Sequence, residues 1–170
     1  MGRCFIGTDR PKSRRTGATA LWRDLIHDLN PEWRPGVPAS GEDFVAGEAT
    51  LGVGLPEELV GLLREKDGVR DVFGAYLIWP ARRIRDDNVA FRSSADFHEL
   101  YMPFDSLLFF GETGGGDQVA YAITGGQIRK PDIYLWDHET DSRVMVAPSL
   151  WAFLEHWKDG SRLKLGPRRN

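Results

Sequence analysis

Cysteine is almost absent from this chain of 170 residues: Cys4 is the only one, so no internal disulfide can form. Nothing in the cysteine content therefore favours an oxidising compartment. Long apolar runs are absent too, since none approaches the roughly 20 residues that a membrane-spanning helix needs. The first residues, MGRCFIGTDRPKSRRTG, lack the apolar stretch of a secretory signal. We expect a cytoplasmic protein with no membrane partner.

The common catalytic and metal-binding motifs are also missing. There is no Gly-x-Ser-x-Gly nucleophile elbow and no His-Glu-x-x-His zinc motif. A run of potential metal ligands does occur, but successive residues at a strand end point to opposite faces, which favours a hairpin turn over a metal site. The run consists of Asp137, His138, Glu139 and Asp141. We predict no catalytic residue, no metal and no cofactor, and keep a hydrolase or metal enzyme, with a triad assembled by the fold, as the weaker alternative.

What the chain does contain is enough apolar sequence for one folded domain, with 41% hydrophobic and 28% charged residues. Its charge is uneven. Residues 1–16 and 158–170 each carry a net charge of +4 and are predicted to be basic tails, the first of them flexible, whereas residues 17–157 hold 12 basic and 23 acidic residues, a net charge of −11. Such an acidic domain should repel nucleic acid and attract a basic protein partner.

The order of elements predicts an α+β fold with a mostly antiparallel sheet. Apolar residues at helical spacing predict helices at 17–29, 40–51 and 56–67 and a closing helix at 149–157. Between them lie a strand at 71–79, a short helix after Pro80 and a meander of four strands, 106–111, 118–123, 133–137 and 143–147. Predicted caps are Ser40 with Asp43, Gly68 and Ser149. The predicted core contains Leu59, Leu63, Phe109, Trp136, Leu154 and Trp157.

The glycine run at 114–116, in FFGETGGGDQVAYAI, resembles a phosphate-binding loop at first sight. Such a loop needs a following helix, whose first N–H groups and positive dipole end bind the phosphate. Here residues 118–123 alternate as a strand, no lysine follows the glycines, and Glu112 and Asp117 would face the phosphate. The glycines are therefore predicted to form a hairpin turn and no nucleotide site.

Three stretches together resemble the SMI1/KNR4 family of the SUKH superfamily. They are LGVGLPEELVGLLREKDGV (51–69), LLFFGETGGGDQVAYAI (107–123) and YLWDHETDSRVMVAPSLWAFL (134–154). The three consecutive glycines, the basic first 16 residues and the GGQIRKPD turn depart from the family pattern. The positions that match it, and that are expected mainly to build the fold, are Leu55, Pro56, Leu59, Leu63, Gly68, Phe110, Gly111, Gly116, Asp117, Trp136 and Asp137.

This resemblance implies a non-enzymatic binding domain with no shared catalytic set. Bacterial members of the family resemble immunity proteins that neutralise nuclease or deaminase toxins in the cytoplasm, and fungal members are regulatory interaction proteins in cell-wall control. Both readings stay open for this chain. Adjacent turns of a meander meet at one sheet edge, so we expect a partner-binding acidic patch there, with solvation of the turns as the plainer alternative. The candidate residues are Asp105, Glu112, Asp117, Asp137, Glu139 and Asp141.

Overall fold

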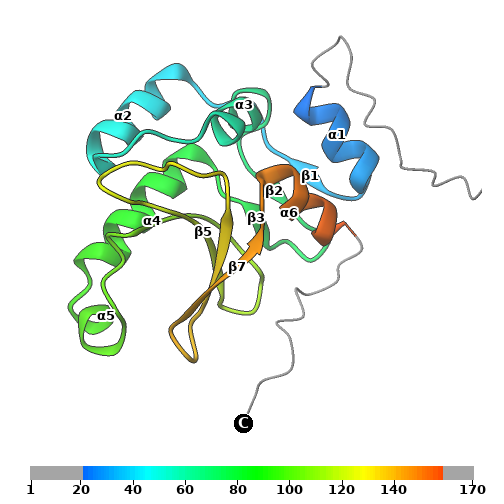
Figure 1. Cartoon of the computed structure of the whole chain (residues 1–170). Coiled ribbons are helices and arrows are strands. Elements are labelled where there is room, and N and C mark those ends of the chain that lie inside the picture. The colour runs from blue at the N-terminus through cyan, green and yellow to red at the C-terminus, as the bar shows by residue number, and fades with distance from the viewer. Residues whose placement is uncertain (1–20, 159–170) are drawn as a thin grey trace, which may run out of the picture.

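The computed structural model describes residues 21–158, so that both predicted basic tails, apart from Lys158, lie outside the described residues (Figure 1). Within that range the fold is α+β, as predicted, and ends on a C-terminal helix. Its elements, in chain order, are α1 (Trp22–Leu29), β1 (Arg34–Pro35), α2 (Gly41–Leu51), α3 (Glu57–Glu65), β2 (Val69–Arg70), β3 (Tyr76–Ile78), α4 (Ala81–Ser93), α5 (Ala95–Leu100), β4 (Leu107–Glu112), β5 (Gln118–Ala122), β6 (Ile133–Asp137), β7 (Ser142–Ala147) and α6 (Leu150–Trp157).

The strands form two antiparallel sheets in place of the one sheet expected. Sheet A has the order β1-β2-β3, and sheet B is the predicted meander, β4-β5-β6-β7. One backbone hydrogen bond joins them directly after β3, where the N–H of Trp79 donates to the carbonyl of Phe110 at 2.7 Å. Within sheet B the register pairs Gln118 with Trp136 and Tyr121 with Ile133.

Three helix boundaries follow from local chemistry, and two of them, at Ser40 and Ser149, are predicted caps. Ser40 and Asp43 form the reciprocal capping box of α2, and Gly52, at φ +68°, ends that helix. The Ser149 hydroxyl accepts the N–H of Ala152 at the start of α6. Each of these devices satisfies backbone groups that a helix end otherwise leaves without a partner.

Gly68 was predicted to cap the helix at 56–67, and this prediction is wrong. Helix α3 ends at Glu65, and Lys66 already has extended backbone. The chain leaves the helix early because the N–H of Asp67 donates to Val37 of the preceding connector. Gly68 still has a positive φ of 88°, but it turns the chain into β2.

The strand predicted at 71–79 is also shorter than expected, because its first half is a turn. The Asp71 carboxylate accepts the N–H groups of Phe73 and Ala75, each at 2.9 Å, and Gly74 takes a positive φ of 90°. An aspartate that binds backbone two residues on is a common turn initiator, and it overrides the strand propensity of the apolar residues beside it. The sequence did not predict β1, β2 or α5.

The core lies around sheet B, which is covered on both faces. Phe91 of α4 packs on Phe109 on one face, and Phe153 of α6 packs on Phe110 on the other. All six predicted core residues are buried. Coverage on both faces explains why the three consecutive residues Val119, Ala120 and Tyr121 of the central strand β5 are all fully buried.

A buried asparagine stabilises an irregularity of β4. The pairing of β4 with β5 shifts register between Phe109 and Gly111, so one residue bulges. Asn88 of α4 accepts the N–H of Phe109 at 2.9 Å and donates to its carbonyl at 2.7 Å. The side-chain amide thus replaces strand partners for this backbone.

No helix among residues 21–158 is long and apolar enough to cross a bilayer.

Candidate functional site

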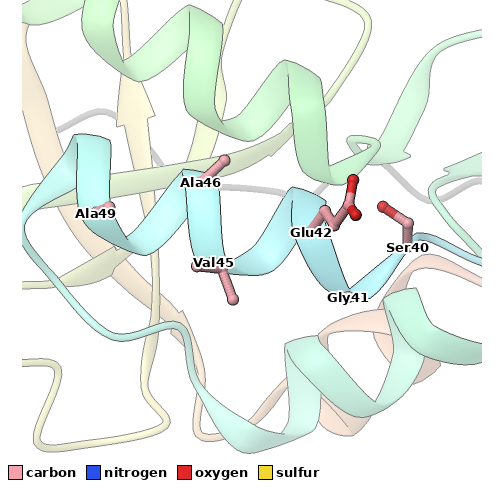
Figure 2. Close-up of a pocket in the computed structure, with 6 residues that line it drawn as sticks. All are labelled: Ser40, Gly41, Glu42, Val45, Ala46 and Ala49. Carbon is pink, nitrogen blue, oxygen red and sulfur yellow. The ribbon is translucent and has the colours of Figure 1, made fainter.

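A pocket of 770 Å³ lies along the exposed side of α2 (Figure 2). Its described lining is mostly small or apolar, and Glu42 is the only residue there that carries a charge. The Ser40 hydroxyl donates to the Asp43 carboxylate in the capping box at 2.7 Å, and this hydrogen bond lowers the pKa of Asp43, so the carboxylate is too weak a base to activate a nucleophile well. The described lining comprises Ser40, Gly41, Glu42, Val45, Ala46 and Ala49.

The feature that gathers the predicted site residues is a row of three turns, 71–75, 113–117 and 138–141, which we call the turn edge (Figure 1). Two close approaches establish the row. A Cβ atom on Gly114 would lie 3.2 Å from that of Ala75, and one on Gly116 would lie 2.7 Å from the His138 ring. The β4–β5 and β6–β7 turns of the meander therefore come together at one edge, and the β2–β3 turn of sheet A joins them there.

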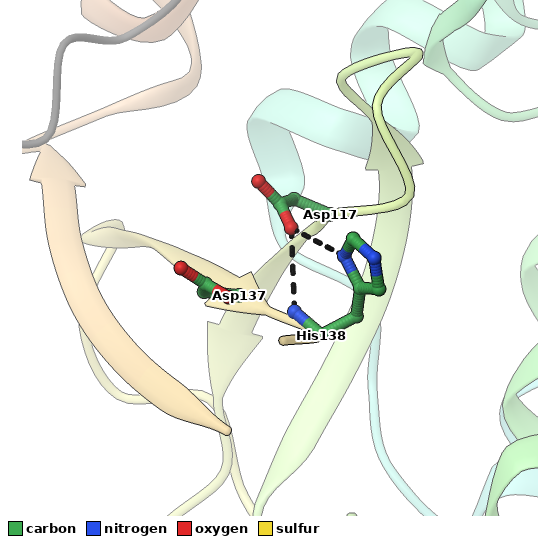
Figure 3. A group of neighbouring side chains, drawn as sticks. All are labelled: Asp117, Asp137 and His138. Atoms are coloured by element: carbon green, nitrogen blue, oxygen red, sulfur yellow. Dashed lines mark hydrogen bonds and ion pairs between the residues drawn. The ribbon is translucent and has the colours of Figure 1, made fainter. Parts of the chain in front are cut away.

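At the middle of the turn edge, Asp117 binds His138 (Figure 3). One carboxylate oxygen lies 2.8 Å from Nδ1 of the ring and 3.3 Å from the backbone nitrogen of the same residue. The hydrogen bond to Asp117 raises the pKa of His138, and burial opposes it. The pair is partly exposed, with 38% of the histidine side chain accessible.

Asp117, Asp137 and His138 are also the group that comes nearest to a metal site among residues 21–158, with one ligand atom of each within 4.8 Å of the others. The grouping differs from the predicted run, because Asp117 from another turn replaces Glu139 and Asp141. One oxygen of Asp137 accepts the N–H groups of Glu139 and Thr140, and Nδ1 of His138 faces Asp117. A metal ligand must be deprotonated at the coordinating atom, so a cation would compete with these turn-stabilising bonds.

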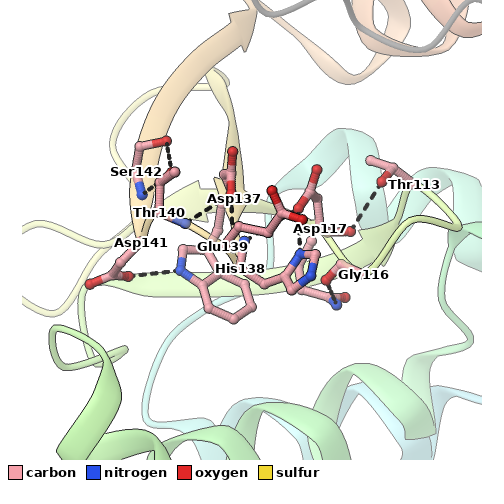
Figure 4. Close-up of polar contacts among 11 residues, drawn as sticks. Thr113, Gly116, Asp117, Asp137, His138, Glu139, Thr140, Asp141 and Ser142 are labelled. Atoms are coloured by element: carbon pink, nitrogen blue, oxygen red, sulfur yellow. Dashed lines mark hydrogen bonds and ion pairs between the residues drawn. The ribbon is translucent and has the colours of Figure 1, made fainter. Parts of the chain in front are cut away.

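The other acids of the turn edge also bind within the fold. Glu112 accepts two hydrogen bonds from the guanidinium of Arg83, at 2.9 and 3.2 Å. Asp141 accepts the indole N–H of Trp136 at 2.8 Å (Figure 4) and the backbone N–H of Met102 at 2.7 Å. Arg83 thus compensates the charge of Glu112, and Arg143 lies 3.5 Å from Asp141. Glu139 is exposed at the tip of its turn.

Asp105 does not belong to this group, and its predicted place in the patch is wrong. It precedes β4, whose first residue Leu107 pairs with Ala122, whereas the last residue Glu112 pairs with Gln118 beside the glycine turn. Asp105 thus lies toward the opposite end of sheet B. Asp105 stands beside a predicted turn, but successive turns of a meander alternate between the two sheet edges.

Sequence reasoning missed the exposed apolar residues of the turn edge. Phe73 is 88% exposed and Val72 is 45% exposed, both at the tip of the first turn. Met102, 55% exposed, lies at the far end of the row, where its N–H binds Asp141. The Asp-x-x-Gly spacing of Asp71 and Gly74 could have identified the first turn, and with it an exposed aromatic side chain.

The positions that match the expected family pattern have structural roles here. Leu59, Leu63, Phe110 and Trp136 are buried, and Pro56 directly precedes α3. A family model with the description "SUKH_6: SMI1-KNR4 cell-wall" matches residues 42–154, from within α2 to within α6. No curated protein matches the chain significantly.

Proposed function

This chain belongs to the SMI1/KNR4 family of the SUKH superfamily, and from that premise we propose that it is a non-catalytic, protein-binding domain of the immunity type. It neutralises a cognate toxin of the nuclease or deaminase class by binding it in the cytoplasm, without turnover of any substrate. The turn edge is the surface that we assign to this contact.

The observation that carries the proposal is the exposed apolar tip beside acidic turns. Phe73, at 88% exposure, and its neighbour Val72, at 45%, form a contiguous apolar tip, and exposed apolar patches rimmed by polar residues are typical of protein interfaces. Phe73 and Met102 stand at the two ends of the turn edge, with the acids of the other turns between them. Such anchors determine how long a complex lasts, because most binding energy comes from a few buried side chains.

Charge supports a basic partner. The net charge of −11 over residues 17–157 would accelerate association with a positive surface such as a nuclease uses for its substrate. Because the acids of the turn edge interact within the fold, we expect this charge to act mainly on the association rate at low salt.

A stand-alone regulatory module is the second candidate, since the matching family model is described by the words "cell-wall". The position of the gene separates the two functions, because an immunity gene lies beside the gene of its toxin. An enzyme is the weakest candidate, because the hydroxyl of Ser40 in the described lining of the α2 pocket donates to a helix-capping carboxylate whose pKa is lowered, which makes that carboxylate a poor general base.

The test starts by capturing partners with the full chain and measuring association and dissociation rates for the partner found. We expect Phe73→Ala to increase the dissociation rate by about tenfold or more, as for an interface anchor. The matched control is Val37→Ala, since Val37 is 78% exposed and lies beyond the far end of sheet A.

Charge is tested in the same system. Glu139→Lys should lower the association rate at low salt and have little effect at high salt, whereas Glu155→Lys, an equal charge change on the exposed side of α6, should have a smaller effect. If Phe73→Ala and Val37→Ala dissociate alike, the turn edge is not the binding surface. If none of the partners captured by the full chain is encoded by a gene beside the chain's own gene, the immunity function is wrong.

A further inference from the structure

Two arginines stand directly opposite each other in sheet A. The register of the antiparallel pair β1 and β2 places Arg34 against Arg70, and both are exposed. Side chains at such positions lie about 5 Å apart at Cβ, and like charges there destabilise the pair.

Neither arginine forms an ion pair within the described part of the chain, although the Asp71 carboxylate lines the same pocket. The guanidinium of Arg70 lies over the ring of Tyr76, 4.3 Å from its centroid, and donates to the Tyr76 hydroxyl. This holds the group in place and leaves most of its N–H donors available. Arg83, 5.4 Å from the same ring, differs because it binds Glu112 and Asp87.

The two arginines border a pocket of 260 Å³ together with the turn 71–74. Asp71 lines it too, but one oxygen of its carboxylate accepts the turn N–H groups of Phe73 and Ala75. The pocket therefore combines two guanidinium groups and one turn-bound carboxylate with the exposed apolar side chains of the turn tip, and its positive charges outnumber the negative one. We call it the arginine pocket; it is lined by Arg34, Arg70, Asp71, Val72, Phe73 and Gly74.

We propose that the arginine pocket binds a carboxylate of a protein partner, with an apolar partner residue packed on Phe73. Planar guanidinium groups bind carboxylates through paired hydrogen bonds. At 260 Å³ the pocket is smaller than the roughly 300–1,000 Å³ of small-molecule sites, which suits one side chain. The acidic domain around it repels a polyanion such as nucleic acid, whereas a single carboxylate beside an apolar group meets little of that repulsion.

The inference rests on the proposed protein-binding function and adds a direction to it. A basic partner that also presents one acidic residue would place that residue in the arginine pocket, at the β2–β3 end of the turn edge. Its basic residues would lie near exposed Glu139, farther along the edge. Complementary charges of both signs fix the orientation of a partner more strongly than one uniform patch. Arg34 precedes the segment 42–154 that matches the family, so the pocket includes a residue from outside that segment.

The experiment follows the side-chain Nε–H signals of Arg34 and Arg70 by NMR in the full chain. The probe is the dipeptide N-acetyl-Asp-Phe-amide, and its uncharged match is N-acetyl-Asn-Phe-amide. We expect saturable shifts of both arginine signals with the first probe and at least about tenfold weaker binding of the second, as for loss of a charge-assisted pair. Inorganic phosphate is titrated in parallel, and binding as tight as that of the Asp dipeptide would overturn the assignment to a protein carboxylate.

Arg34→Gln should abolish the saturable shift at Arg70, whereas Arg129→Gln, in the exposed β5–β6 connection, should leave it unchanged. The denaturant midpoint of Arg34→Gln should equal or exceed that of the parent, because a like-charge contact is removed. An unaltered response in Arg34→Gln refutes the arginine pocket and leaves the proposed function standing if Phe73→Ala still weakens partner binding. If the dipeptide binds but the full chain captures no partner, the proposed function is refuted and the arginine pocket stands.

Discussion

At the residue scale, the glycine run is explained by packing between turns. Gly114 and Gly116 have positive φ values of 76° and 99°, and strand β5 follows them where a phosphate loop would have a helix. The space that a side chain would need at Gly116 is filled by the His138 ring. The sequence predicted the turn from its neighbouring residues. The contact with His138 joins two separate turns, so the local sequence of neither turn indicates it.

The Asp117–His138 pair predicts a pH-dependent contribution to stability. The pKa of His138 is raised by its hydrogen bond to Asp117, so the pair contributes fully below the unfolded value of about 6.5 and is lost as pH rises through the raised pKa. Asp117→Asn should therefore lower the free energy of unfolding more at about pH 5.5 than at about pH 8.5. Since the side chains are partly exposed, the difference should not exceed about 1 kcal/mol.

Denaturant titrations at the two pH values measure this difference, and the NMR titration of the His138 ring gives its pKa directly. Asp132→Asn is the control, because Asp132 precedes β6 at the other end of sheet B from His138. A His138 pKa that is the same in the parent and in Asp117→Asn would show that the carboxylate does not hold the ring.

The site shows how far residue-level prediction reaches. Glu112, Asp117 and Asp141 were expected at one edge from the meander alone, and they lie there. Their partners within the fold were not predicted. Arg83, which binds Glu112, lies in α4, and Met102, which binds Asp141, lies in the loop before β4. Pairing between charges distant in sequence depends on the final packing, which local patterns do not encode.

At the scale of the elements, long and periodic segments were predictable and short ones were not. Helices α2, α3, α4 and α6 and the strands of sheet B have clear periodicity or caps. By contrast, β1 and β2 have two residues each, and one of the four is proline. Two residues contain no period, so such strands exist only because tertiary contacts bring them together.

Gly111 sets the distance between sheets A and B. A Cβ atom at this position would collide with the carbonyl oxygen of Leu77 in β3, and also with Val119. Gly111→Ala should therefore destabilise the fold by about 1–3 kcal/mol or more, since backbone would have to move. The free energy of unfolding in denaturant measures the effect.

Gly47→Ala provides the matched control. Gly47 lies within α2, and a Cβ atom there meets nothing within 4 Å. The same substitution should stabilise the protein by roughly 0.5–1 kcal/mol, because alanine is the better helix former. Equal effects of the two alanines would mean that sheets A and B do not approach each other as closely as described.

At the scale of the whole molecule, the family segment and the fold do not coincide. The match begins at residue 42, so that α1 and β1 lie before it, yet Ile26 of α1 and Trp33 are buried. Helix α1 packs on α3 and α6, which places the start of the described chain beside its end. Composition alone predicts the acidic character of residues 17–157. The division into two sheets depends on how the chain passes from β3 to β4, which composition does not indicate.

The difference in pairing between the two sheets has a consequence for the route of folding. Strands of sheet B pair with their neighbours along the chain, so each contact closes a short loop at small entropic cost. Sheet A needs the distant pairing of Arg34 with Arg70, which is slower to find. We therefore expect the transition state to contain sheet B and to lack most of sheet A.

A matched pair of buried valines makes this measurable, since Val69 in sheet A and Val119 in sheet B are both fully buried. In stopped-flow folding experiments, Val119→Ala should mainly slow folding, and Val69→Ala should mainly accelerate unfolding. The reverse pattern would place sheet A first. If sheet B forms first, Arg34 and Arg70 pair only after the transition state. The turns 113–117 and 138–141 of the turn edge would then form before the turn that carries Phe73.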